Sequence, residues 1–226
     1  MRTKFDQQLE TLHVELIQMG AVCEEAISAA AQALLKKDET LAAAAEAAEQ
    51  ELDRREREVE HLCLKLLLRQ QPVAGDLRQI SAALKMISDL ERIGDQAADI
   101  AELAREIILP EEHSLHLSTM AEAVARMVTD SVDSFVRSDL ELARRVCRFD
   151  DWVDSAFEQV RDELIALIAE DPAFGRQGLD LLMVAKYLER IGDHATNLAE
   201  WVEYAVTGQR SKDGAPYLPD VEKSGM

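Results

Sequence analysis

Acidic side chains recur at four-residue spacing in two segments of the chain that are close copies of one another. The segments are LERIGDQAADIAE (90–102) and LERIGDHATNLAE (188–200), which are identical at nine of 13 positions. A spacing of four places side chains one turn apart on the same face of a helix. The polar residues at this spacing are Glu91, Asp95 and Asp99 in the first segment and Glu189, Asp193 and Asn197 in the second. Each segment therefore predicts a line of oxygen donors along a helix.

This line of donors continues an apolar stripe that includes Leu77, Ile80 and Leu84, so we expect it to be partly buried. Carboxylates held together away from water repel one another, and they must be protonated, paired with a base or bound to a cation. Oxygen donors suit hard cations such as Mg²⁺, Mn²⁺ or iron. The duplicated segment thus predicts a metal-binding site in each half of the chain.

Salt bridging is the competing interpretation of the same acids. The neighbouring Arg92 and Arg190 are expected to point away from the acidic line, about 80° around the helix. The bases that remain as partners are Arg78 in the same helix and Arg54, Arg55 and Arg57 in the preceding one. Duplication of the whole hexapeptide, glycine included, favours metal binding over salt bridging. Gly94 and Gly192 each cost about 1 kcal/mol inside a helix relative to alanine. A close helix approach beside the acids would explain that cost.

Further acids occur in the helix that precedes each segment. Glu49 and Asp53 correspond to Asp150 and Asp154 at an offset of 101 residues. If each half is an up-down-up bundle of three helices, these residues approach the acidic lines and are candidate ligands. The alternative is that they belong to a solvated helix surface.

The pattern of apolar residues and helix breakers predicts six long helices in an all-α protein. Asp38 and Ser138, the latter with Glu141 as a capping box, are expected to begin the second and fifth helices. The predicted ranges are 5–36, 38–69, 73–108, 114–136, 138–169 and 178–206, with turns at 70–75 and 170–178. Internal duplication then gives two tandem three-helix bundles, 1–110 and 111–206, followed by a disordered tail, 207–226.

The wheel of the third helix also has a face that we expect to meet solvent, between the acidic line and a second apolar stripe. His194 in the sixth helix is expected to point the same way. The residues of this face in the third helix are Lys85, Asp89, Arg92 and Gln96.

Composition excludes several classes of function. With 25 basic and 44 acidic residues the net charge is −19, which disfavours nucleic-acid binding, and by itself this charge also suits a solubilising surface. No run of 18 uncharged apolar residues or signal peptide is present, so we expect a cytoplasmic protein without membrane insertion. Cys23, Cys63 and Cys147 are expected to be small buried thiols of a reduced protein.

The duplicated LERIGD segment, preceded by the turn QQPVAGDLR, closely resembles the PhoU family over about residues 5–206. Members of this family carry an E(D)xxxD motif in both halves. The motif residues here are Glu91 with Asp95, Glu189 with Asp193, and as further matches Glu49 with Asp53 and Asp150 with Asp154. Asn197 departs from a full set of acids, which implies weaker binding in the second half.

The resemblance implies a metal-binding, six-helix accessory regulator of phosphate uptake, commonly a homodimer. It implies contact with the ATPase subunit of the phosphate ABC transporter and with the phosphate-sensing histidine kinase. It further implies repression of phosphate-starvation genes when phosphate is plentiful. The metal would be Mg, Mn or Fe, and no catalysis is expected.

Three other functions compete with this interpretation. An enzyme is disfavoured because the sequence has no GxxxxGK, GxSxG or HExxH motif. A ferritin-like di-metal carboxylate bundle would use ExxH pairs, and two are present, Glu10–His13 and Glu58–His61. A histidine-phosphotransfer bundle needs an exposed histidine among bases, whereas His194 follows an acid.

Overall fold

The computed structural model describes residues 2–70, 72–108 and 116–210. Six long α-helices carry almost all of its regular structure, which confirms the all-α prediction. The elements are α1 (Arg2–Lys36), α2 (Glu39–Gln70), α3 (Ala74–Ala104), α4 (Leu117–Arg137), α5 (Leu140–Glu170), the 3₁₀ turn η1 (Pro172–Phe174) and α6 (Gly175–Thr207).

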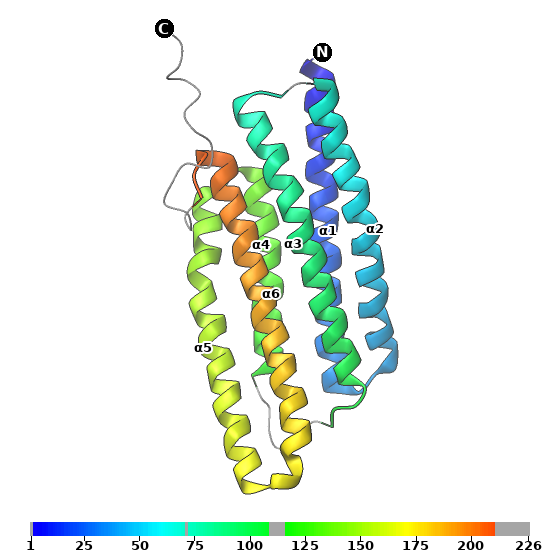
Figure 1. The fold of residues 1–226 in the computed structure, drawn as a ribbon, viewed down its shortest axis with the longest axis vertical. Helices are drawn as coiled ribbons and strands as arrows, with labels where there is room; N and C mark the ends of the chain where they lie inside the picture. The colour runs from blue at the N-terminus through cyan, green and yellow to red at the C-terminus, as the bar shows by residue number, and fades with distance from the viewer. Residues whose placement is uncertain (1, 71, 109–115, 211–226) are drawn as a thin grey trace.

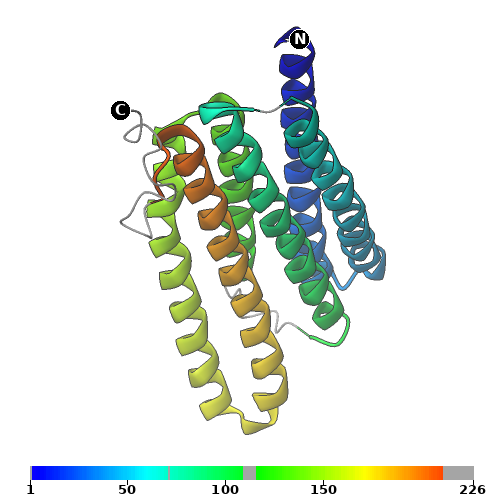
Figure 2. The same cartoon turned by 45° about the horizontal axis from the view of Figure 1, so that its top comes forward.

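The helices form two three-helix bundles that lie side by side (Figure 1). In each bundle every helix packs against the other two, α1–α3 in the first and α4–α6 in the second. The halves meet where α3 packs against α6 and α1 against α4, whereas α2 and α5 lie at the outer edges (Figures 1 and 2). Buried residues from all six helices form a single apolar core, so the two halves stabilise each other.

Two helix starts test the predicted caps. Asp38 does precede α2, and its Oδ1 accepts a hydrogen bond from the Thr40 amide at 2.9 Å. Ser138 was wrongly predicted as a cap, because it adopts a left-handed conformation (φ 52°) that ends α4. The cap of α5 is Asp139, whose Oδ1 accepts from the Leu142 amide at 2.9 Å. The chain reverses direction between α4 and α5 through the left-handed residue Ser138, so the cap of α5 is the next residue, Asp139.

Two predicted helix boundaries differ from the structure for a clear physical reason. Helix α3 ends at Ala104 instead of residue 108, because the chain leaves the helix and turns Ile107 into the core, where it is 2% exposed. Helix α6 begins at Gly175, inside the predicted turn, after Asp171 has capped η1. Only residues 207–210 of the predicted tail lie within the described residues. The predicted fourth helix, 114–136, is seen from Leu117 onward, and residues 109–115 lie outside the described part of the chain.

The face of α3 predicted to meet solvent forms part of the interface between the halves. Gln96 is 5% exposed, and Asp89 Oδ1 lies 2.9 Å from Nδ1 of His194 on α6. The prediction of solvent exposure was therefore wrong for these residues and for His194. A wheel drawn for one three-helix bundle leaves this face free, and only the packing of the second bundle covers it. Lys85 and Arg92 do remain exposed.

The cysteines are free thiols, and two of them are fully buried. Cys23 and Cys63 have 0% exposure, as predicted, whereas Cys147 is only half-buried. Burial raises the pKa of the Cys63 thiol to about 12 and that of Cys147 to about 11. No helix among the described residues is long and apolar enough to cross a bilayer.

Candidate metal-binding faces

Four predicted acids gather where α2 packs beside α3, and we call them the first acidic face: Glu49, Asp53, Glu91 and Asp95. Burial raises the pKa of the Glu49 carboxyl, and the charges of Asp53 and Asp95 raise it further. The pKa of Glu91 is likewise raised, by burial and then by the charge of Asp95, with a smaller effect of Asp53. The up-down-up arrangement therefore brings the acids of α2 within electrostatic range of those on α3.

The corresponding acids of the second half form the second acidic face: Asp150, Asp154, Glu189 and Asp193. The pKa of Asp150 rises to about 6, chiefly because burial penalises its charge. The charges of Asp154, Asp193 and Glu189 raise it as well. The protein thus holds Asp150 in a position where neutralising its negative charge is favourable.

Glycines bring the helices together beside both faces, as predicted. A Cβ on Gly94 would lie 2.5 Å from Cδ1 of Leu52, a fully buried side chain that precedes Asp53 on α2. A Cβ on Gly192 would lie 3.3 Å from both Oδ1 of Asp150 and Cγ1 of Val153. Each glycine offsets its poor helix propensity by allowing the acidic helices to approach closely.

Basic side chains already compensate part of the charge. Arg92 Nη1 lies 2.7 Å from Asp95 Oδ2, and its Nε lies 3.3 Å from Glu91 Oε2. The expectation that Arg92 points away from the acids was wrong, because its long side chain reaches around the helix to Asp95, one turn further along, and to the adjacent Glu91. On the second face Lys186 pairs with Glu189. Salt bridging is therefore present, although the Arg92 pairs are exposed and contribute little stability.

The other predicted bases differ in their partners. Arg54 and Arg55 pair with Glu51 and neighbouring acids outside the first acidic face. Arg57 comes within 4.0 Å of Asp53. Arg78 donates instead to the carbonyl oxygen of Ala205 at the end of α6.

The remaining pair of predicted ligands, Asp99 and Asn197, lies toward the interface between α3 and α6. Burial raises the pKa of Asp99, as do the charges of Asp95 and Glu102, while a hydrogen bond with Tyr187 of α6 lowers it. Asn197 of α6 donates a hydrogen bond to Asp89 of α3 at 3.5 Å. Each of the two residues thus contacts a residue on the helix of the other half. These two residues connect the acidic faces to the contact between the halves.

Glu56 and Lys186 are contributors that the sequence analysis missed. Glu56 accepts a hydrogen bond from Ser88 at 2.9 Å and raises the pKa of Glu91. At the corresponding places in the second half stand Phe157 and Lys186, whose ammonium lies 5.4 Å from the Phe157 ring centre. The sequence did contain a signal for these residues: Glu56 and Ser88 in the first half are replaced by Phe157 and Lys186 at the equivalent positions of the repeat. Both faces therefore contain a cation, Arg92 on the first and Lys186 on the second, but only the first has the additional acid Glu56.

Among the residues that the structure describes, no three histidine, cysteine, aspartate or glutamate side chains form a preorganised metal site. The donor chemistry nevertheless fits a hard cation, since the carboxylates on each face raise one another's pKa. Binding at either face requires side chains to rotate inward and Arg92 or Lys186 to move away. The ligand roles of all ten residues remain predictions.

His13 and His61, the histidines of the two ExxH pairs, do not form the di-metal site of the ferritin-like alternative. His13 stacks edge-on against Phe135 of α4, at 5.7 Å between ring centres. His61 is exposed on α2, and Glu58 pairs with Arg54. His194 is paired with Asp89 instead of lying free among bases, which is unfavourable for phosphotransfer.

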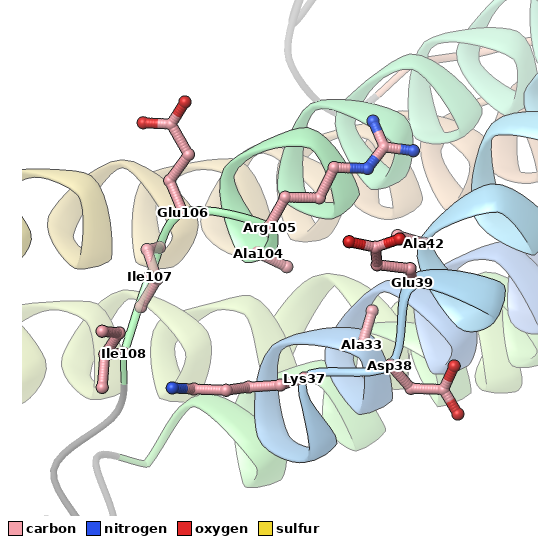
Figure 3. Close-up of a pocket in the computed structure, with 10 residues that line it drawn as sticks. All are labelled: Ala33, Lys37, Asp38, Glu39, Ala42, Ala104, Arg105, Glu106, Ile107 and Ile108. Carbon is pink, nitrogen blue, oxygen red and sulfur yellow. The ribbon is translucent and has the colours of Figure 1, made fainter.

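A cavity of about 330 Å³ lies between the turn that joins α1 to α2 and the end of α3 (Figure 3). Its charged lining residues include Lys37, Glu39 and Arg105, and Ile107 contributes an apolar wall. Arg105 is already paired with Glu46 at 2.7 Å. None of the predicted ligands lines this cavity.

Comparison with known proteins identifies the family. A family model described as the PhoU domain matches the chain twice, at residues 16–104 and 117–202. The chain belongs to the PhoU family. Two similar proteins are each named "Phosphate-specific transport system accessory protein PhoU homolog". The one from Clostridium acetobutylicum is 38% identical and covers 92% of this chain and 97% of its own length. The one from Aquifex aeolicus is 39% identical, over 83% and 86%.

Solved structures of family members share the fold. The crystal structure of PhoU from Pseudomonas aeruginosa superposes with a TM-score of 0.86 at 34% identity, covering 91% of this chain and 100% of that one. The phosphate transport system regulatory protein PhoU from Streptococcus pneumoniae gives a TM-score of 0.83 at 26% identity, over 91% and 98%. The match spans both bundles, so the two halves belong to one family fold.

Proposed function

We propose that the protein is an accessory regulator of phosphate uptake that binds metal ions on its two acidic faces. The observation that carries the proposal is the double PhoU-domain match, together with relatives named for the phosphate-specific transport system. The protein acts without catalysis, as a binding partner in the cytoplasm.

Its partners are the ATPase subunit of the phosphate ABC transporter and the phosphate-sensing histidine kinase. By contacting both, the protein holds the kinase in a repressing state when phosphate is plentiful, and phosphate-starvation genes stay off. It works as a homodimer. The long helices supply rigid surfaces for these contacts, because one apolar core connects both halves.

Metal binding is unequal between the halves. Mg²⁺, Mn²⁺ or an iron ion binds more tightly at the first acidic face, where Glu56 adds a further negative charge. At the second face the Lys186 ammonium must leave Glu189 before a cation can be bound there. The bound cation relieves the repulsion among carboxylates and fixes α2 against α3 and α5 against α6.

A genetic experiment tests the regulatory role. Deleting the gene should raise alkaline phosphatase activity in phosphate-rich medium, and restoring the wild-type gene should lower it. A variant with Ala at Glu49, Asp53, Glu91 and Asp95 should fail to restore repression, whereas the exposed control Glu122→Ala should restore it. Unchanged phosphatase on deletion would refute the regulatory role. Full repression by the quadruple variant would refute the role of the first acidic face while leaving the regulatory role intact.

A further inference from the structure

The turn between α2 and α3 and the turn between α5 and α6 lie at opposite ends of the molecule (Figures 1 and 2). Both turns expose apolar side chains. We call them the α2–α3 tip, residues 64–69 and 72–78, and the α5–α6 tip, residues 161–183. At the α2–α3 tip Leu68 is 81% exposed and Val73 is 72% exposed. At the α5–α6 tip Ile165 and Leu179 are each 60% exposed. Exposed apolar groups of this size mark interaction surfaces when they gather at one place.

The folded chain does not need these side chains for its own packing. Leu66 is fully buried in the core, whereas Leu68, two positions along the helix, points the other way. Val73 is the residue that precedes the first turn of α3, and its side chain caps nothing. The apolar exposure of the α2–α3 tip is thus available to another surface.

The two tips differ in charge. The α2–α3 tip contains three basic residues and one acidic residue, whereas the α5–α6 tip contains two basic and five acidic ones. Lys65 and Arg69 are exposed, and neither makes an ion pair within the part of the chain that the structure describes. In a protein with a net charge of −19, a basic end with exposed leucine and valine is the exception.

We propose that the α2–α3 tip docks onto the surface of an anionic lipid bilayer. Leu68 and Val73 enter the boundary between headgroups and acyl chains, while Lys65 and Arg69 contact lipid phosphates. The same bilayer repels the acidic α5–α6 tip, so charge decides which end approaches. The long bundle then stands end-on, with the α5–α6 tip directed away from the membrane (Figure 1).

The acidic faces do not prevent this contact. Glu91 lies 17 residues beyond Ala74 along α3, which is about 25 Å at 1.5 Å per residue. The Debye length at physiological ionic strength is about 8 Å, so repulsion between the first acidic face and the bilayer is screened. The local charge of the tip therefore outweighs the net charge of the protein.

Vesicle co-sedimentation of the full chain tests the proposal. The protein should bind vesicles that mix phosphatidylglycerol with phosphatidylcholine and should not bind phosphatidylcholine alone. Changing Leu68→Ser and Val73→Ser together should weaken binding about tenfold or more. The matched control, Ile165→Ser with Leu179→Ser, removes similar apolar exposure at the other end and should leave binding unchanged. Thermal unfolding should show that both double variants fold.

A charge variant supplies the second measurement. Lys65→Ser and Arg69→Ser should each weaken binding about fivefold, and added salt should weaken the wild type in the same direction. The proposal is overturned if the wild type ignores the anionic vesicles, or if the control variant loses as much binding as the tip variant. It is also overturned if the wild type does not bind vesicles while the tip variants lose gene repression in cells, because the tip then binds a protein partner and not a bilayer.

Discussion

Asp150→Asn should stabilise the metal-free protein at neutral pH, although it alters a residue of the acidic motif. The pKa of Asp150 rises from an ordinary 3.8 to about 6, and at about 1.4 kcal/mol per unit this is about 3 kcal/mol of unfavourable free energy when the group is charged. Water reaches one side of this half-buried carboxyl and screens its charge, so we expect about 1–2 kcal/mol in practice. In a chain of this length that raises Tm by roughly 3–6 °C.

The dependence on pH identifies the cause. Because the pKa of Asp150 is higher in the folded state than in the unfolded one, its charge costs stability above pH 6, and this cost disappears as the pH falls toward 4. The difference in Tm between the variant and the wild type should therefore be largest at pH 7 and close to zero near pH 4. Calorimetry in the presence of a chelator measures both values.

Asp151→Asn is the matched control, since Asp151 is the exposed neighbour on the same helix. It should change Tm by less than about 1 °C at either pH. A lower Tm for Asp150→Asn at pH 7, or a difference that persists unchanged at pH 4, would show that burial and the neighbouring acids do not penalise the charge of Asp150 as described.

Three further predictions concern packing and reactivity. Gly94→Ala should lower stability by about 1–2 kcal/mol in urea unfolding, because the new methyl group displaces the buried Leu52. Cys147 should be the first thiol to react with a maleimide in the native protein, and slowly, since its pKa is raised to about 11. A double-mutant cycle of Asp89→Ala with His194→Ala should show a coupling of at least about 0.5 kcal/mol across the two halves.

Each of these has a control and a contrary result. A Cβ added at Gly75 would meet open space, so Gly75→Ala should leave stability unchanged or raise it slightly. Equal losses of stability for Gly94→Ala and Gly75→Ala would contradict close helix packing at Gly94. Rapid labelling of Cys23 or Cys63 in native protein would contradict their burial. Purely additive effects in the double-mutant cycle would show that the contact between α3 and α6 carries no energy at that pair.

The fold was predictable because local pattern and duplication agree. Helix periodicity and the offset of the repeat gave six helices in two related bundles, and Gly94 correctly indicated close helix packing. Ser138 was misassigned because serine suits both a cap and a left-handed turn, and only the path of the chain decides between them. Ala104 ends α3 for a tertiary reason, the burial of Ile107, which no local pattern contains.

The candidate site was predictable in part. Spacing placed the acids of each half on facing helices, as the shared pKa effects of Glu49 and Asp95 show. The position of Arg92 was not predictable, because a long side chain can reach acids from either side of its helix. The role of His194 could not be predicted either, since its partner, Asp89, lies 105 residues away in the sequence on another helix.

Elemental analysis of the purified protein tests the central claim most directly. Wild-type protein should contain a bound divalent or trivalent metal ion, and replacing Glu91 and Asp95 with Ala should remove the larger part of it. Replacing Glu189 and Asp193 should remove the smaller part, since the additional acid Glu56 of the first face is replaced by Phe157 in the second half. Metal content that is absent in the wild type, or unchanged in both variants, would contradict the assignment of the acidic faces as metal sites.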